Sequence, residues 1–320
     1  MDYLIDDSLN GKTVLKFMSC TLGLSRATIK HLKFKPCGIE VNGSHVTVRH
    51  VLSRGEVLSL AIEDTQAPEK LSPCDLDIDI AYEDDEVVVP NKPADMPTHQ
   101  SFGHYKDTVA NALAYRYASR GIPFVFRPVN RLDRNTSGLL LIARDRVSAA
   151  SLSAAMREHK ISKRYVAILH GVPKNDRGTI DTYMRRTAKS VIVREICGEG
   201  EGGDRAITEY EVICKSETHT LVAATPITGR THQLRVHFAS IGCPIEGDDM
   251  YGEASELISR HALHSFSLSF PRPSDGSTLT VTAPLPDDMR ILAERVLSNA
   301  LDTVSKDIKN IILPTQEENI

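Results

Sequence analysis

The sequence has no long apolar run, no paired cysteine motif and no strong net charge. No stretch reaches the roughly 18 apolar residues of a membrane-spanning helix, and the acidic residues 1–7 lack the basic region of a signal peptide. The six cysteines are scattered without a Cys-x-x-Cys pair, which favours free thiols over disulfides or a zinc site. These absences predict a cytoplasmic protein that does not cross a membrane.

Cofactor motifs are missing as well. No glycine-rich stretch lies between a strand-like run and a helix-like run, and there is no phosphate loop or Cys/His cluster. The glycines of residues 198–203 are not followed by a helical pattern, so they predict a flexible hairpin tip. His232 and His237 are five positions apart, a poor spacing for one helix face. We therefore expect chemistry that needs no cofactor and no metal.

The net charge of −4 hides an uneven distribution. Residues 11–60 contain eight Lys or Arg against two acids, and residues 127–165 contain nine against three. Residues 61–95, between them, contain eleven acids against two lysines. Because local basic faces attract phosphates whatever the total charge, the two basic regions are candidate nucleic-acid surfaces. Each region taken alone could also be an ordinary solvated face.

A polar loop that leads into an apolar strand-like run, residues 128–145, is the most informative segment. Its carboxylate, Asp133, lies close in sequence to Arg131 and Arg134, and nearby cations favour the ionised form of an acid. A carboxylate held in this way can act as a nucleophile. The simpler alternative is a turn cap or a structural ion pair. Asp145 begins the next helical segment and is expected to cap it, which leaves Asp133 without a second catalytic acid.

Three stretches resemble the motifs of pseudouridine synthases of the RluA, RluC and RluD type. They are Asn91-Lys92-Pro93-Ala94, Arg131-Leu132-Asp133 with Thr136-Ser137-Gly138, and Thr228-Gly229-Arg230-Thr231-His232-Gln233-Leu234-Arg235-Val236-His237. The family usually has His in place of Asn130 and Gly in place of Asp95. Pro90 is expected to end its strand early. These departures leave the shape and support of the loops in question.

The resemblance implies the roles of the site residues. Asp133 is the expected nucleophile, Arg235 its ion-pair partner, Tyr165 the active-site tyrosine and Leu234 an apolar neighbour of the bound base. From its position two residues before Asp133 and its planar side chain, we expect Arg131 to fill the stack when a uridine is flipped out. The expected RNA contacts in the third motif are Arg230, His232 and Gln233.

The front of the chain resembles the S4 RNA-binding domain. Residues 12–22 have helical apolar spacing, Ser25 is a good cap for a second helix, and Asn42-Gly43 predicts a hairpin turn after a strand. Residues 46–48 and 57–60 are expected to add further strand. The second helix would grip phosphates through Arg26, Lys30 and Lys33.

We therefore expect an α+β protein. Its parts would be an S4-like RNA-binding domain (1–62), a linker (63–79), a synthase domain with a mixed, largely antiparallel sheet flanked by helices (80–300), and a tail (301–320). The expected activity is conversion of uridine to pseudouridine in structured RNA by a monomer. Large-subunit ribosomal RNA is the first substrate class and transfer RNA the second. Two alternatives stay open: an RNA- or ribosome-binding protein with an impaired synthase domain, and a carboxylate glycosidase.

Overall fold

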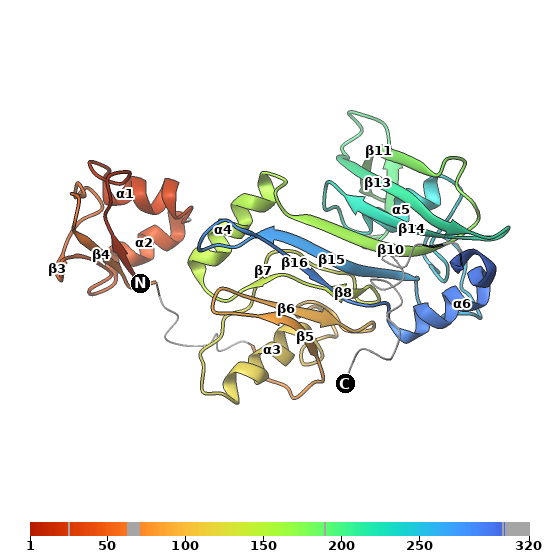
Figure 1. Cartoon of the computed structure of the whole chain (residues 1–320), viewed down its shortest axis with the longest axis horizontal. Coiled ribbons are helices and arrows are strands. Elements are labelled where there is room, and N and C mark those ends of the chain that lie inside the picture. The colour runs from red at the N-terminus through yellow and green to blue at the C-terminus, as the bar shows by residue number, and fades with distance from the viewer. Residues whose placement is uncertain (25, 63–70, 189, 303, 305–320) are drawn as a thin grey trace.

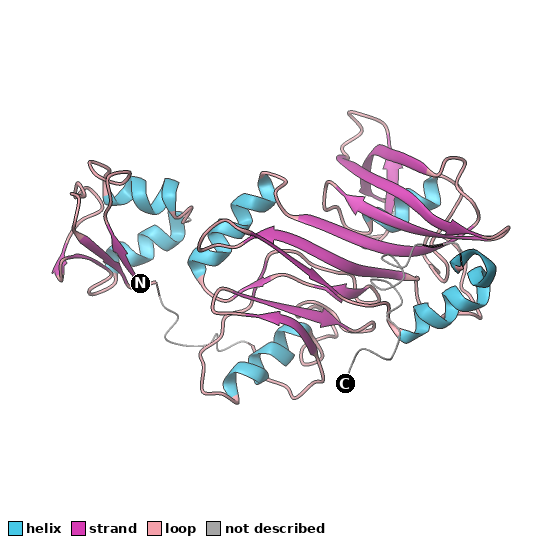
Figure 2. Cartoon of the chain, in the orientation of Figure 1, coloured by secondary structure: helices cyan, strands magenta, loops and turns pink. Residues whose placement is uncertain are grey.

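The computed structural model describes residues 1–24, 26–62, 71–188, 190–302 and 304. It contains a four-stranded sheet near the N-terminus and a twelve-stranded sheet in the rest of the chain (Figure 1 and Figure 2). Among the described residues, no helix combines the length and apolar character needed to cross a bilayer.

The N-terminal module, residues 1–62, forms a small sheet in the order β1-β4-β2-β3 with two helical segments. Its elements are β1 (Asp2–Leu4), α1 (Val14–Lys16), the π-helical turn η1 (Phe17–Thr21), α2 (Arg26–Phe34), β2 (Ile39–Val41), β3 (Ser44–His45) and β4 (Val57–Leu60). Asn42 and Gly43 turn the β2–β3 hairpin with φ of 50° and 76°, as the sequence predicts. The predicted cap Ser25 and the first part of the predicted linker, residues 63–70, lie outside the described residues.

The prediction of strand at residues 46–48 was wrong. β3 ends at His45, and the chain turns at Thr47, whose carbonyl accepts a hydrogen bond from the amide of His50 at 3.0 Å. The carbonyl of Val48 accepts from the amide of Leu15 at 2.9 Å. This segment therefore supports the first helical turn and does not extend the sheet.

The module has its own apolar core, and that core also touches the rest of the chain. Val147 and Ala150 of helix α4 (Arg146–Arg157) pack against it. Asp145 caps α4 by accepting hydrogen bonds from the amides of Val147 and Ser148 at 2.7 and 2.9 Å, as predicted. Helix α4 thus joins the module to the large sheet.

The large sheet is mixed and largely antiparallel, as expected. The main path of strands runs β12-β11-β13-β14-β10-β15-β8-β6-β9-β7, with β16 beside β15 and β5 beside β6. The strands are β5 (Asp79–Glu83), β6 (Val87–Lys92), β7 (Arg127–Pro128), β8 (Ser137–Leu139), β9 (Ile142–Ala143), β10 (Ser162–His170), β11 (Arg177–Arg186), β12 (Arg194–Cys197), β13 (Asp204–Lys215), β14 (His219–Pro226), β15 (Leu263–Pro271) and β16 (Thr278–Thr282). In the described chain, β8 and β15 form the one parallel pair between these strands.

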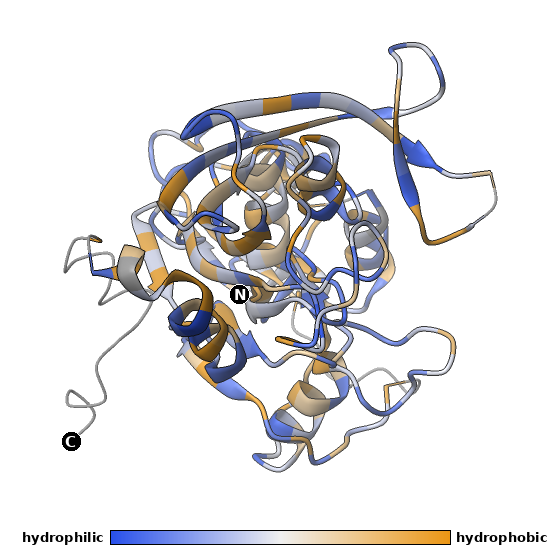
Figure 3. Ribbon diagram, turned by 90° about the vertical axis from the view of Figure 1, so that its right-hand side faces the viewer, coloured by the Kyte–Doolittle hydropathy of each residue, from blue (hydrophilic) through white to orange (hydrophobic). Residues whose placement is uncertain are grey.

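Helices α4, α5 (Gln233–Ser240) and α6 (Asp287–Leu301) pack against this sheet, and α3 (Val109–Ala118) shares its main core. The core brings together β10, β14, α3 and α6, and Figure 3 shows hydrophilic and hydrophobic residues alternating along the chain. The second part of the predicted linker is tied down, because the side-chain amide of Asn111 in α3 donates to the carbonyl of Ser72 at 2.7 Å. Residues 305–320 of the predicted tail lie outside the described residues.

Pro90 does not end its strand, which corrects the expectation from sequence. β6 continues through Pro90 to Lys92, and the carbonyl of Pro90 accepts from the amide of Leu140 at 3.1 Å. Proline has no N–H to donate, so the neighbouring strands adapt to it. β5 changes register between Ile80 and Tyr82, opposite Pro90. On the other side, the apolar run that the sequence predicts as one strand is divided into β8 and β9.

Candidate active site

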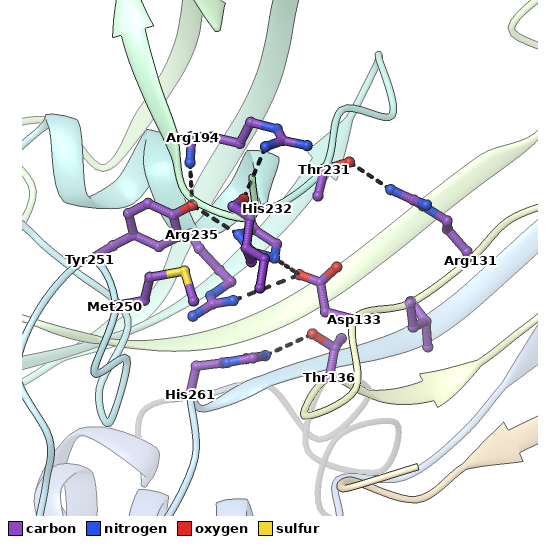
Figure 4. Close-up of polar contacts among 12 residues, drawn as sticks. Arg131, Asp133, Thr136, Arg194, Thr231, His232, Arg235, Met250, Tyr251 and His261 are labelled. Carbon is purple, nitrogen blue, oxygen red and sulfur yellow. Dashed lines mark hydrogen bonds and ion pairs between the residues drawn. The ribbon is translucent and has the colours of Figure 1, made fainter. Parts of the chain in front are cut away.

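A cleft of about 680 Å³ brings the three predicted catalytic side chains together. Asp133 enters it from the β7–β8 loop, Tyr165 from β10 and Arg235 from α5. Figure 4 shows Asp133 and Arg235 pointing toward each other. The other predicted contacts of this region also line the cleft: Arg131, Arg230, His232, Gln233 and Leu234. Arg26, Lys30 and Lys33 lie elsewhere, exposed on helix α2 of the N-terminal module.

Asp133 stands in a loop that is held at several points. The carbonyl of Asp133 accepts from the amide of Thr136 at 3.1 Å, and the carbonyl of Leu132 accepts from the hydroxyl of Thr98 at 2.9 Å. The ammonium group of Lys92 donates to the carbonyls of Pro93 and Arg134 at 2.7 and 2.8 Å. The Asp133 side chain keeps 26% of its surface exposed, so its carboxylate faces the cleft from a rigid support.

Lys92 was missed by sequence reasoning as a support of this loop. Its side chain is fully buried, and burial lowers its pKa from 10.5 to about 7, with the neighbouring Arg260 acting in the same direction. The motif around Lys92 was recognised, but nothing in the local sequence shows that its side chain reaches under the loop of Asp133.

The guanidinium of Arg235 lies between two carboxylates. Its Nε and Nη2 donate to the two oxygens of Asp248, both at 2.7 Å, while Nη1 lies 4.0 Å from Oδ2 of Asp133. The predicted pairing with Asp133 is therefore present as a long ion pair, and the tight partner is Asp248. Burial lowers the pKa of Arg235, but the hydrogen bonds and charge of Asp248 outweigh it and hold the pKa above its ordinary value.

Asp248 is a second carboxylate beside the site, and sequence reasoning missed its role. Its side chain is fully buried and accepts from the amides of Met250 and Tyr251 at 3.1 and 3.2 Å in addition to Arg235. Burial raises its pKa, but these hydrogen bonds and the charge of Arg235 lower it overall. Asp248 is therefore ionised, and both of its oxygens already accept hydrogen bonds. Asp133, in contrast, has a carboxylate that is accessible from the cleft.

His232 approaches the same carboxylate oxygen of Asp133 as Arg235 does. It takes a left-handed conformation with φ of 58°, and its Nε2 is 3.9 Å from Oδ2 of Asp133. Its Nδ1 is hydrogen-bonded to the hydroxyl of Tyr251 at 2.8 Å, and that hydroxyl accepts from the amide of Arg194 at 2.9 Å. Burial lowers the pKa of His232 despite the nearby Asp133, so the ring is neutral at pH 7. Tyr251, whose role sequence reasoning also missed, therefore orients His232.

Tyr165 contributes an aromatic face and a protonated hydroxyl to the cleft wall. It is buried, and Ser265, its cross-strand neighbour, lies close to its hydroxyl. Burial raises the pKa of Tyr165 far above its ordinary value. The hydroxyl therefore stays protonated over the physiological range, which makes it a poor general base.

The arginines next to Asp133 in sequence are not its partners. Arg131 donates to the hydroxyl of Thr231 at 2.5 Å, and Arg134 pairs with Asp95 at 2.6 Å. The cation that approaches the carboxylate comes from Arg235, about a hundred positions later. Arg131 and Arg134 were expected to favour the ionised form of Asp133 as nearby cations, but both side chains extend to other loops.

The other residues of the third motif that were predicted to contact the substrate differ in whether their side chains are available to do so. The side chain of Gln233 is buried, accepts from Thr228 and the amide of Arg230, and donates to Ile207 and Thr208. These bonds fix the shape of the loop, which leaves Gln233 little capacity for RNA. Arg230 is exposed and donates to the carbonyl of Arg205 at 3.1 Å, and Leu234 presents a mostly buried apolar surface.

The two departures from the family pattern fit the loops they occupy. Asp95 has a φ of 62°, the left-handed conformation that glycine takes easily and that Asp tolerates better than most residues. The side-chain oxygen of Asn130 accepts from the amide of Leu141 at 2.7 Å, which ties the catalytic loop to the strand region. Asp95 thus takes a backbone conformation that glycine also adopts, and Asn130 holds the loop through its oxygen, while its buried amide nitrogen has no hydrogen-bond partner among the described residues.

The cleft is basic apart from its one acid. The described residues that line it include five Lys or Arg side chains and one carboxylate, Asp133; the cations are Arg131, Arg157, Lys163, Arg230 and Arg235. A cleft lined mainly by cations attracts a polyanion, and its single carboxylate is a candidate reactive group.

The comparisons with known proteins name the family. A sequence model described as RNA pseudouridylate synthase matches residues 86–240. The chain is 37% identical to an uncharacterized RNA pseudouridine synthase, YjbO, of Bacillus subtilis, over 84% of this chain and 94% of the relative. The chain therefore belongs to the RNA pseudouridine synthase family.

Two further similarities agree with this result. The ribosomal large subunit pseudouridine synthase D of Zymomonas mobilis is 34% identical over 86% of this chain and 90% of the relative. The structure of human RNA pseudouridylate synthase domain containing 1 matches with a TM-score of 0.55 at 28% identity, over 67% of this chain and 86% of that one.

Proposed function

We propose that this enzyme converts specific uridines of large-subunit ribosomal RNA to pseudouridine, with Asp133 as the nucleophile. The observation that carries the proposal is the position of Asp133: it is the only carboxylate among the described residues that line a basic cleft, and Arg235 and Tyr165 face the same space. Family membership supplies the reaction, and the cleft supplies a place for one extruded nucleotide.

The reaction exchanges one glycosidic bond for another. Asp133 attacks C1′ of the ribose as the bond from C1′ to N1 of uracil breaks, and the base takes up the bonding electrons. The base then rotates, and C5 attacks C1′ while the carboxylate leaves. C5 loses its proton and N1 gains one, so the product is an isomer of the substrate. No redox step or group donor is involved.

The role of each side chain around Asp133 follows from its hydrogen bonds and its protonation state. Arg235 offers Nη1 to Asp133 while Asp248 holds its other edge, so the cation stabilises and aims the ionised nucleophile. Tyr165 remains protonated, which favours stacking on the uracil over proton abstraction. Neutral His232, beside Asp133, can exchange hydrogen bonds with the base edge or the ribose. Leu234 adds an apolar contact.

A uridine inside a helix must leave its stack before Asp133 can reach it, at a cost of about a few kcal/mol. The exposed Arg131 lies at the mouth of the cleft, bound to Thr231 in the free protein. If the guanidinium of Arg131 gives up this one hydrogen bond, it can stack between the RNA bases and fill the position that the flipped uridine leaves.

The choice of large-subunit ribosomal RNA rests on two features. A relative that is 34% identical over most of both chains is named a ribosomal large subunit pseudouridine synthase. The N-terminal module, which we propose to be an S4-like RNA-binding domain, exposes Arg26, Lys30 and Lys33 along one helix. A second binding surface outside the cleft suits a large folded RNA, with transfer RNA as the next candidate.

Replacement of the nucleophile tests the proposal. Asp133→Asn should lower pseudouridine formation in ribosomal RNA transcripts by at least about 1,000-fold, because the amide cannot attack C1′, while RNA binding is kept. Asp249→Asn, which changes an exposed acid near Asp248, should retain full activity and serves as the control. Pseudouridine would be counted by chemical labelling and primer extension.

The same assay distinguishes the alternatives. An unchanged rate in Asp133→Asn would remove Asp133 from the chemistry. An inactive parent protein that still binds ribosomal RNA would favour a binding protein with an impaired synthase domain. Release of free uracil would favour a glycosidase.

A further inference from the structure

We propose that His170, His219 and Glu246 form a binding site for a divalent transition-metal ion, Zn²⁺ in the first place. Their candidate ligand atoms all lie within 4.8 Å of one another. Among the described residues this is the one group of three or more His, Cys, Asp or Glu side chains with such spacing. None of the three belongs to the lining of the cleft described above, so the site is separate from the proposed catalytic centre.

The backbone places the two histidines opposite each other. His170 ends β10 and His219 begins β14, and the two residues are direct partners in the antiparallel pairing of these strands. Their rings lie 5.2 Å apart between centroids. A cross-strand pair of this kind projects both side chains to the same side of the sheet, so a metal could bind both with little rearrangement.

The third ligand comes from a segment that is fixed to the same strand. The amide of Glu246 donates to the carbonyl of Ile168 at 2.9 Å, and the amide of His170 donates to the carbonyl of Pro244 at 2.8 Å. The carbonyl of Glu246 also accepts from the amide of Ala262 at 2.9 Å. Glu246 is therefore held in place by its backbone, and its buried carboxylate is directed at the histidines.

The distances suit a small cation. Oε2 of Glu246 lies 3.1 Å from Nδ1 of His170 and 3.3 Å from Nε2 of His219. Nitrogen and oxygen ligands bound to Zn²⁺ at about 2.0–2.2 Å in a tetrahedron are separated by roughly 3.3–3.6 Å. The carboxylate edge of the site thus already has nearly the spacing of a metal complex. Only the two histidine nitrogens need to approach further, and the side chain of His170, 66% exposed, is free to turn.

The chemistry of His219 supplies a second, independent reason. Only 8% of this residue is exposed, yet its Nε2 makes no hydrogen bond within the described chain, although the carboxylate of Glu246 is adjacent. Its Nδ1 is hydrogen-bonded to the hydroxyl of Thr218 at 2.9 Å. If Nδ1 carries the ring proton, the lone pair of Nε2 faces the carboxylate, and a cation between them removes the repulsion. A partner on the far nitrogen is the usual second support of a metal-bound histidine.

The ligand set defines the class of ion. Two imidazoles and one carboxylate suit Zn²⁺, with Co²⁺, Ni²⁺ and Cu²⁺ as competitors, and disfavour Mg²⁺ and Ca²⁺, which prefer oxygen ligands. Water would complete the coordination from the exposed side of His170. Bound metal would link the ends of β10 and β14 to the segment of Glu246. That segment continues directly to Asp248, the partner of Arg235, so the ion would stabilise the support of the cleft without entering it.

Zinc binding by the untagged, full-length protein tests the proposal. Protein stripped with a chelator and returned to metal-free buffer would be titrated with ZnCl₂ in competition with a chromophoric chelator. We expect one tight site, and at least about a tenfold loss of affinity in His170→Ala, His219→Ala and Glu246→Gln. His45→Ala, which removes an exposed histidine from β3, should leave the affinity unchanged.

Two further measurements test the proposal even if His219→Ala, a substitution of a buried residue, prevents folding. Zinc should raise the Tm of the wild type and of His45→Ala, but not of His170→Ala or Glu246→Gln. The Co²⁺ spectrum should show nitrogen and oxygen ligands without a thiolate charge-transfer band. Equal zinc affinity in the wild type and Glu246→Gln would overturn the proposal, and so would a thiolate band, because the metal would then be bound by cysteine.

Discussion

At the scale of single residues, the site depends on how one guanidinium is shared. Arg235 gives its Nε–Nη2 edge to the buried Asp248 and leaves Nη1 for the accessible Asp133. A bidentate contact fixes the plane of the guanidinium, so the direction of Nη1 is fixed too. Asp248 therefore acts on the nucleophile only through Arg235, as a positioning residue.

This arrangement predicts a large effect at position 248 and none at its neighbour. Asp248→Asn should lower kcat by about 100-fold through a small displacement of Arg235. It should also lower the free energy of unfolding by about 3–5 kcal/mol, because Arg235 would stay buried without its charge partner. Asp249→Asn, at an exposed position, should change stability by less than about 0.5 kcal/mol. Single-turnover kinetics and urea unfolding measure both quantities, and similar results for the two variants would contradict the role of Asp248.

The sequence predicted some of these residues and missed others for a physical reason. Asp133 and Arg235 stand in long motifs, and Tyr165 was named from the family resemblance, so each could be named before the fold was known, and the cleft brings all three together. The partners that hold them are set by the folded chain. Asp248 meets Arg235, and Lys92 meets the carbonyl of Arg134, through side chains whose direction no local pattern specifies.

At the scale of elements, the loop of Asp133 is fixed by the strand that follows it. β8 runs parallel to β15, and Gly138 pairs with Ser265. A Cβ at Gly138 would lie 2.3 Å from the backbone oxygen of Ser265, and its φ is 109°. Only glycine allows the two strands to approach this closely, five residues after the nucleophile.

Replacement of Gly138 tests this contact. Gly138→Ala should lower the free energy of unfolding by at least about 4 kcal/mol, because backbone atoms must move to admit the methyl group. Gly121→Ala is the matched control: its φ is 69°, and a methyl group added there would meet no described atom within 4 Å. That variant should lose only about 1–2 kcal/mol, the conformational cost alone. Equal losses in urea unfolding would show that close packing at Gly138 is unimportant.

Local elements were predictable wherever one short signal decided them. The Asn42-Gly43 turn and the Asp145 cap are found as expected, since each depends on the residue itself and its nearest neighbours. Pro90 and residues 46–48 were misjudged because other strands and helices decide their conformation. A register shift in β5 accommodates the missing N–H of Pro90. The carbonyl of Val48 accepts a hydrogen bond from the first helix and not from a neighbouring strand.

At the scale of the whole molecule, the cleft and helix α2 are two basic surfaces of the described chain. If both contact one RNA, removal of charge from α2 should weaken binding without a change in the chemical step. The triple variant Arg26→Ala, Lys30→Ala, Lys33→Ala should lower affinity for ribosomal RNA and reduce the slope of log affinity against log salt by about 2–3. Lys174→Ala, an exposed change outside both surfaces, should leave the slope unchanged. An unchanged slope in the triple variant would exclude α2 from the interface.

The fold also buries several neutral histidines, which predicts a loss of stability in mild acid. Burial lowers the pKa of His237 and His264 from 6.5 to about 4 and that of His261 to about 3. Below pH 6.5 the unfolded chain takes up protons that the folded chain does not, so stability falls as the pH decreases towards 4. Between pH 6.5 and 4.5 the loss should be on the order of 5 kcal/mol.

Urea unfolding at half-unit pH steps measures this loss. The range above pH 4.5 separates the histidines from carboxylates such as Asp248, whose lowered pKa places their contribution in stronger acid. A flat stability across the range would show that these rings are protonated in the folded protein.

The parallel pairing of β8 with β15 joins positions 137–138 to 264–265. During synthesis, the ribosome must therefore release the chain as far as β15 before the loop that carries the nucleophile can reach its final support. A nascent chain interrupted before β15 would hold an acid with no fixed surroundings, so the enzyme cannot act on RNA until β15 has been made.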